Sequence, residues 1–409
     1  MSEALFPFTL RKITHPPLPP AVLHREALLQ QLNDAITGGS CESDKGGSAY
    51  KLILLHAPAG YGKTTLLADF TRQAVLPCCW YLLDRSDADK ITFLEYLLAS
   101  VRTQFPFFGS ALDLSLAAAA DQGAEDSFEA LVELFVEALA REIPERFALF
   151  LCNYHEVHEN AQINTLVNRL LQGVTPCVLV IESRVVPDLA FASLLARREM
   201  CVISRERFRL NSEEVTALAC LQGLTALDQG EAEHLAAVFD GWMAGILLGT
   251  RLGEVRHLAG KTNGVAPLLR GLPASSVDRQ FLFAYVVTEV FKDHPDLYDF
   301  LKDACVLEEM TPSLCNALLG IADASERLHA LEYYGLFVSR SGVPPQETYL
   351  CHPVLRDLLA EELRQQEPES FALLHRRAAE LLGEAQDYER AITHALSAKI
   401  EQMAADLIL

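Results

Sequence analysis

Residues 51–65 of the 409-residue chain read KLILLHAPAGYGKTT, and they carry the strongest signal for its fold class. Its first part, 51–56, is a short apolar run that is typical of a strand buried on both faces. The second part, 57–65, matches the phosphate-binding P-loop pattern, with Ala57 where the first glycine usually stands. A helical run over 66–73 follows. A strand, a glycine-containing turn and a helix in this order predict nucleotide binding.

Each part of the loop has a physical task. Gly60 and Gly62 let backbone N–H groups turn inward around an anion. The helix presents its positive N-terminal dipole to the phosphates. Lys63 supplies a full charge to the β- and γ-phosphate oxygens, and the hydroxyl of Thr64 is a ligand for Mg²⁺. The loop residues predicted to bind the nucleotide are Ala59, Gly60, Tyr61, Gly62, Lys63, Thr64 and Thr65.

Further strands are predicted over 79–83, 148–152 and 177–181, separated by long helical patterns. This alternation predicts an α/β fold, a parallel sheet with helices on both faces. A Pro-rich arm and an amphipathic helix over 25–36 precede it.

After about Leu210 helical patterns dominate, beginning with Asn211 as a predicted helix N-cap. The stretches 337–339 and 348–350 flank a Gly/Pro turn and predict a hairpin, which after helices suggests a winged helix. From about Ser370 two short helices look like the start of a TPR-like repeat array that stops early, so the chain looks like a truncation. The predicted domains are an arm and first helix (1–48), a P-loop nucleotide-binding domain (49–209), an all-α helical lid (210–275), a winged helix (276–366) and the start of a repeat arm (367–409).

Composition excludes several classes of function. Lys and Arg total 34 against 55 Asp and Glu, and the formal net charge of -21 makes the chain a poor non-specific binder of DNA or anionic membranes. Ten scattered cysteines include no C-x-x-C pair. Since the sequence shows neither a signal peptide nor an apolar run of about 18 residues, we expect a cytoplasmic protein with reduced thiols and no membrane contact.

Several segments resemble, in the same order, the MalT-like branch of the STAND signalling NTPases, the large ATP-binding regulators of the LuxR family. Besides the P-loop they are WYLLD at 80–84, SRVVP at 183–187, GWMAG at 241–245, CHPVL at 351–355, LHRRAA at 374–379 and AITHAL at 391–396. The resemblance implies a signal-transduction switch in transcription regulation, with ATP or ADP as cofactor and Mg²⁺ accompanying ATP. ADP would favour a closed resting state, whereas ATP and an unknown inducer would favour self-association. DNA would be bound only through a C-terminal module that is absent from this chain.

The resemblance also assigns roles outside the loop. Arg184 would sense the γ-phosphate, His352 would sense the β-phosphate of the resting nucleotide, and His24 and Arg25 would lie near the adenine. Structural roles are the alternatives, a core position for His352 and a surface salt bridge for Arg184.

One departure from the family concerns hydrolysis. The family's second acidic motif ends a strand with two Asp residues, where this chain has Cys152 and Asn153. Asn supplies no charge and Cys is a poor ligand for Mg²⁺, so we expect at most a slow ATPase with no assigned catalytic residue. Glu156 and Glu182 lie near in sequence as candidates to rescue hydrolysis.

Two patterns are expected to carry no metal. HEVH at 155–158 lacks the i, i+4 histidine spacing of zinc peptidases, and the acidic stretch 125–137 is predicted to be an amphipathic helix with a solvated face. For function, two alternatives to the switch stay open: a true P-loop ATPase or small-molecule kinase, and a scaffold whose P-loop is structural.

Overall fold

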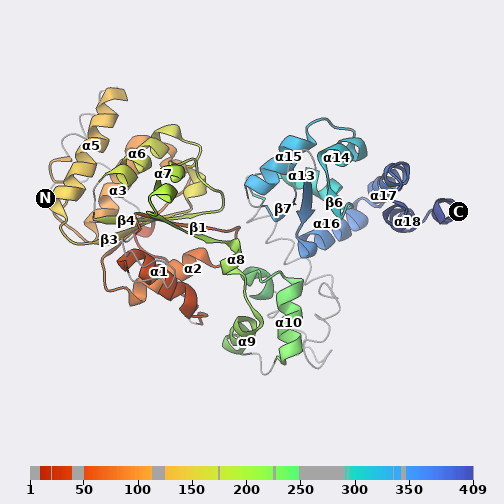
Figure 1. The fold of residues 1–409 in the computed structure, drawn as a ribbon, viewed down its shortest axis with the longest axis horizontal. Coiled ribbons are helices and arrows are strands. Elements are labelled where there is room, and N and C mark those ends of the chain that lie inside the picture. The colour runs from red at the N-terminus through yellow and green to blue at the C-terminus, as the bar shows by residue number, and fades with distance from the viewer. Residues whose placement is uncertain are drawn as a thin grey trace. The chain divides into compact units, whose positions relative to one another are not determined.

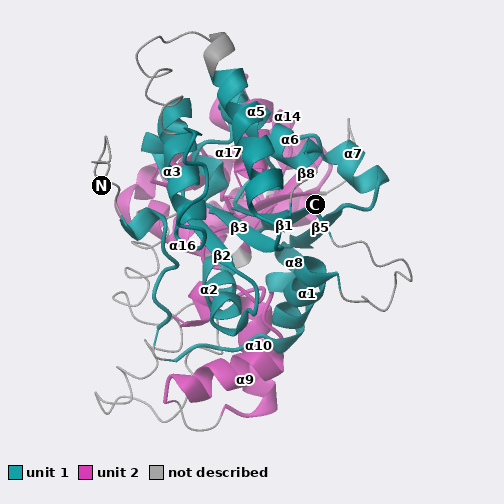
Figure 2. Cartoon of the chain, turned by 90° about the vertical axis from the view of Figure 1, so that its left-hand side faces the viewer, with its two compact units in different colours: residues 1–57, 61–208 teal, residues 58–60, 209–409 magenta. Residues whose placement is uncertain are grey.

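The computed structural model describes residues 10–19, 21–38, 50–112, 125–173, 176–223, 227–247, 291–292, 294–334, 336–341 and 347–408 (Figure 1). It divides into two compact units (Figure 2). Unit 1 comprises Met1–Ala57 and Tyr61–Phe208, and unit 2 comprises Pro58–Gly60 and Arg209–Leu409. The predicted domain boundaries stay predictions, and those at 48/49 and 275/276 lie outside the described residues.

Unit 1 contains a five-stranded parallel sheet with the order β2-β3-β4-β1-β5. Its strands are β1 (Leu52–His56), β2 (Cys78–Leu82), β3 (Phe147–Cys152), β4 (Cys177–Ser183) and β5 (Met200–Ser204). The four predicted strands are confirmed with ends shifted by one or two residues. The edge strand β5 was not predicted.

Helices cover both faces of this sheet, as predicted. Figure 1 shows α1 and α2 on one side, and α3, α5, α6 and α7 on the other. The helical elements of unit 1 are η1 (Leu10–Lys12), α1 (Glu26–Thr37), α2 (Lys63–Gln73), η2 (Arg85–Ala88), α3 (Lys90–Arg102), α5 (Glu125–Glu142), η3 (Tyr154–Glu156), α6 (Ala161–Gln172), α7 (Phe191–Ala196) and α8 (Arg205–Phe208).

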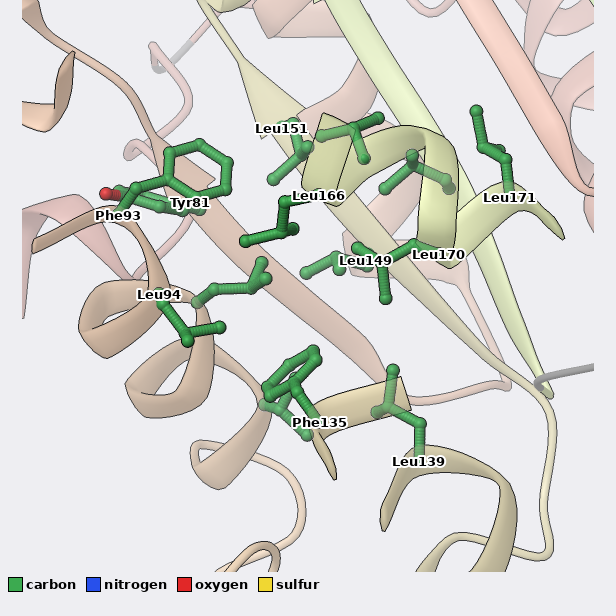
Figure 3. Close-up of a cluster of buried hydrophobic side chains, with 14 of the residues drawn as sticks. Tyr81, Phe93, Leu94, Phe135, Leu139, Leu149, Leu151, Leu166, Leu170 and Leu171 are labelled. Atoms are coloured by element: carbon green, nitrogen blue, oxygen red, sulfur yellow. The ribbon is translucent and has the colours of Figure 1, made fainter. Parts of the chain in front are cut away.

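Successive side chains of β3 point to opposite faces of the sheet and pack against the helices on each face. Leu149 and Leu151 join the apolar cluster with α3, α5 and α6 (Figure 3), whereas Phe150 faces the other way and packs edge-on against Phe70 of α2 at 6.3 Å. Burying each such side chain contributes about 1.5–3 kcal/mol. The predicted amphipathic helix is present as α5, with Leu131 and Phe135 on its buried face and Leu134 exposed on its solvated face. This packing holds the carboxyl ends of β1, β3 and β4 in fixed register.

Unit 2 combines helices with a small antiparallel sheet. Its helices are α9 (Ser212–Leu221), α10 (Gln229–Val238), α13 (Pro295–Ala304), α14 (Pro312–Leu319), α15 (Ala324–Tyr333), α16 (Pro353–Gln366), α17 (Pro368–Glu384), α18 (Tyr388–Ser397) and α19 (Glu401–Ile408). The predicted hairpin is confirmed as β7 (Val338–Ser341) and β8 (Thr348–Cys351), and β6 (Glu309–Met310) adds a third strand in the order β6-β8-β7. Asn211 caps α9 as predicted, in a reciprocal capping box with Glu214.

Candidate nucleotide-binding site

The P-loop joins the end of β1 to the start of α2. Gly60 and Gly62 have positive φ angles of 78° and 84°, in the left-handed region that favours glycine, and Gly62 is the N-cap of α2. The helix begins at Lys63, so Lys63 and Thr64 occupy its first turn, where backbone N–H groups lack partners within the helix. This local geometry is suited to binding an anion.

Lys63 is nearly buried, with 5% of its surface exposed. Its Nζ donates to the carbonyl oxygen of Ala57 at 2.6 Å and lies 3.1 Å from Oε1 of Glu182. Burial lowers the pKa of Lys63, and the charge of Glu182 opposes this shift. A buried carboxylate therefore stabilises the cation of the loop.

The end of β3 supplies no carboxylate. Cys152 is fully buried, which raises the pKa of its thiol well above the usual value and keeps it neutral. Asn153 has a left-handed backbone with φ of 59°, and its N–H donates to Oε2 of Glu182 at 2.9 Å. Glu182 thus contacts both Lys63 and the backbone that follows β3. From sequence it was only one of two candidates near the motif.

His155 also lies at this edge of the sheet. In the sequence it belongs to the HEVH pattern, which was expected to bind no metal. Burial, together with the positive charges of Arg184 and Lys63, lowers the pKa of His155 to about 2, so the ring is neutral. Both ring nitrogens are buried without a hydrogen-bond partner among the described residues. His158, the second histidine of the HEVH pattern, contacts the carbonyl oxygen of His155 through Nδ1 at 2.6 Å.

The two residues predicted to lie near the adenine have protein partners in the structure. His24 contacts Asp69 through Nδ1 at 2.8 Å. Arg25, 8% exposed, donates to the carbonyl oxygens of Arg207 and Phe208 and so joins the start of α1 to α8. Both residues thus have contacts within unit 1 that need no nucleotide, and their predicted roles at the adenine stay predictions.

His352 lies in unit 2, at the N-cap of α16. It is 7% exposed, and its Nε2 contacts the carbonyl oxygen of Phe239 at 3.2 Å. The rings of Phe337 and Trp242 lie edge-on to it at 5.7 and 6.3 Å. This is the environment of a packed core histidine, and its predicted β-phosphate contact stays a prediction.

The tip of the loop, Pro58–Gly60, clusters with unit 2. Within that unit, Nε1 of Trp242 donates to the carbonyl oxygen of Ala59, and the N–H of Ala244 donates to that of Gly60, both at 3.0 Å. A Cβ at Gly60 would lie 2.6 Å from Nε1 of Trp242. The GWMAG segment therefore requires glycine at this position for close approach, independently of any nucleotide.

Known proteins resemble this chain along most of its length. Residues 287–371 match the family model described as the MalT winged helix domain. The HTH-type transcriptional regulator MalT of Vibrio cholerae is 27% identical over 400 residues, covering 95% of this chain and 41% of the relative. The serine/threonine-protein kinase PknK of Mycobacterium tuberculosis is 28% identical over 368 residues, covering 89% of this chain and 32% of the relative. The chain thus spans well under half the length of these relatives.

Among solved structures, the Walker-type ATPase PABY2304 of Pyrococcus abyssi aligns with a TM-score of 0.49 and 15% identity, over 83% of this chain and 96% of that one. Within the described residues, no helix is both long enough and apolar enough to cross a membrane. The winged-helix match, the alignment with MalT regulators along most of the chain, and the P-loop on a parallel sheet together support the resemblance to a MalT-like STAND P-loop NTPase.

Proposed function

We propose that the chain is the nucleotide-binding sensor part of a MalT-like transcription regulator. It rests with ADP bound, and ATP together with an inducer shifts it toward self-association. DNA contact belongs to a module outside these 409 residues. The observation that carries the proposal is the buried Lys63 in the first turn of α2, held at the carboxyl edge of the sheet.

The chain's own residues divide the work of binding. The N–H groups of 60–65 and the ammonium group of Lys63 bind the phosphates. The oxygen donors of this edge, the Thr64 hydroxyl and the Glu182 carboxylate, are the type that Mg²⁺ prefers, so the residues fit this ion. When bound, Mg²⁺ neutralises charge on the β- and γ-phosphate oxygens.

Arg184 follows β4 at the same edge and adds the second cation near Lys63. Moving a two-state equilibrium from 1:99 to 99:1 takes about 5.5 kcal/mol of differential affinity. A γ-phosphate near two cations is a suitable source for a difference of this size.

Turnover is expected to be slow, because Cys152 and Asn153 leave β3 without a base for the attacking water. The switch would then be reset by nucleotide exchange. The second candidate function is a true P-loop ATPase or small-molecule kinase, which the carboxylate of Glu182 beside Lys63 favours. Release of phosphate at rates near the typical enzyme value of about 10 s⁻¹ would support the second candidate over the switch.

The first prediction tests nucleotide binding. Lys63→Ala removes the side-chain cation of the loop and should weaken ATP and ADP binding at least tenfold, about 1.4 kcal/mol, in calorimetric titrations. Lys51→Ala is the matched control, since Lys51 is a partly exposed cation paired with Glu199 just before the same strand. Light scattering should show association of the wild type with ATP but not with ADP once inducer is present. Equal affinities in wild type and Lys63→Ala would overturn the proposal.

A further inference from the structure

The strand order places one acid between the two motifs of the nucleotide site. β4 lies between β1, which leads into the P-loop, and β3, which lacks a terminal acid. In the register of these strands, Leu55 of β1 is opposite Glu182, and Leu151 of β3 is opposite the preceding Ile181. Glu182 is therefore level with Cys152, on the strand between Cys152 and the P-loop.

The contacts of Glu182 match this position. One carboxylate oxygen lies 3.1 Å from Nζ of Lys63, and the other accepts from the N–H of Asn153 at 2.9 Å. Only 2% of the Glu182 surface is exposed. The side chain thus bridges the loop cation and the end of β3.

Stability alone is a weak reason for a charge at this position. Removing two ions from water costs more than an apolar pair of similar volume, and replacement of buried ion pairs by apolar residues is often neutral or stabilising. The neighbours of Glu182 on both adjacent strands, Leu55 and Cys152, are neutral. A buried carboxylate that faces the P-loop lysine is instead suited to binding the ligand of that loop.

Glu156, the other acid near the end of β3, contacts different side chains. Glu156 lies 3.6 Å from Nε of Arg85 and 3.6 Å from Nε2 of His155, and nearly a quarter of its side chain is exposed. Among the described residues, Glu156 forms no ion pair with Lys63. The geometry therefore separates the two candidates that the sequence left open.

We propose that Glu182 is the relocated carboxylate of this site, taking over from β4 the Mg²⁺-nucleotide binding role for which β3 lacks an acid. The inference rests on the proposed function, because it assumes that the P-loop binds nucleotide. Mg²⁺ is held in proteins by one or two carboxylates together with waters and substrate phosphates. Glu182 and the Thr64 hydroxyl would supply the protein's share of the oxygen donors.

The experiment measures how much Mg²⁺ tightens ATP binding. Calorimetric affinities for ATP are determined in Mg²⁺ and in EDTA, and their ratio is the Mg²⁺ increment. In Glu182→Gln the shape of the side chain is kept and the charge is lost, so the increment should fall at least tenfold. Glu182→Asp keeps the charge but shortens the reach, and its increment should lie between those of Glu182→Gln and wild type. Glu182→Asp also serves as the test if Glu182→Gln does not fold.

Glu156→Gln is the matched control, and its Mg²⁺ increment should equal that of the wild type. An unchanged increment in Glu182→Gln, or in Glu182→Asp if only that variant folds, would make Glu182 a counter-ion of Lys63 and overturn the inference. Wild type that binds no ATP under either condition would contradict the proposed function itself. The two failures are thus distinguishable.

Discussion

Two buried contacts between titratable side chains differ in charge. In unit 1, Lys63 and Glu182 form an ion pair at the edge where β1 and β4 end. In unit 2, His375 of α17 and His394 of α18 meet through their Nδ1 atoms at 2.9 Å, with 9% and 6% of their surfaces exposed. Burial, followed by the neighbouring His394, lowers the pKa of His375 to about 4, and burial also lowers the pKa of His394.

The difference in charge between the two pairs indicates different roles, ligand binding for the ion pair and helix packing for the histidine pair. One neutral imidazole donates to the other, so the histidine pair is complete without a ligand and joins two helices. The ion pair retains charge in a place where charge is costly, beside a loop built for anions. Buried polar side chains in this molecule therefore serve either to pack helices together or to bind a ligand. The histidine pair is neutral and the ion pair is charged.

The largest expected effect comes from removing one member of the ion pair. Lys63→Met or Glu182→Leu leaves an uncompensated buried charge and should lower the free energy of unfolding by about 3–5 kcal/mol. The double variant Lys63→Met/Glu182→Leu replaces both charges by apolar groups and should lie close to wild type. Urea unfolding without nucleotide measures the three variants. Single variants as stable as wild type would show that this pair is not a desolvated ion pair.

A smaller effect is expected from glycine replacement at the loop. Gly60→Ala combines a positive φ with a Cβ that would lie 2.6 Å from Nε1 of Trp242. Gly320→Ala, the matched control, has φ of 70° but nothing within 4 Å of its Cβ, so strain acts alone. Strain of this kind costs about 1–3 kcal/mol, and Gly60→Ala should exceed Gly320→Ala in chemical unfolding. Equal losses would indicate that Trp242 and Ala244, whose Cβ would lie 2.7 Å from the added Cβ, both move aside.

The smallest effect concerns the histidine pair and pH. In the unfolded chain a histidine binds its proton near pH 6.5, whereas His375 in the folded chain binds it only near pH 4. Its contribution to stability is thus fully present above pH 6.5 and is lost as the pH falls toward 4. We expect the stability difference between wild type and His375→Phe/His394→Leu to shrink over this range. A difference that is independent of pH would mean that the two histidines bind their protons over the same pH range in the folded and unfolded chain, and would contradict this prediction.

The sequence was sufficient for elements whose signal is local. The strands of 52–56 and 147–152 are continuous apolar runs, and the P-loop has a fixed spacing of glycines and lysine. β5 was missed because it is a short edge strand that directly follows the charged residues Arg197, Arg198 and Glu199 and is only partly buried.

The acid of the site required knowledge of the tertiary structure. Glu182 is 29 residues from Asn153 and far along the chain from Lys63, and only the strand order brings the three together. The same holds for the histidine pair, since both motifs were visible in the sequence but their contact follows from the packing of α17 against α18. The sequence motif was therefore enough to find the P-loop, whereas the order of the strands was needed to find the carboxylate of Glu182.

Burial of the Lys63–Glu182 pair also bears on how fast a nucleotide arrives. Opposite charges 3.1 Å apart largely cancel at long range, while the whole chain carries -21. An approaching anion therefore meets net repulsion until it is inside the loop, and salt, which screens beyond about 10 Å at 0.1 M, relieves that repulsion. Long-range electrostatic attraction therefore does not speed nucleotide binding. The association rate of the nucleotide should increase with moderate salt rather than decrease.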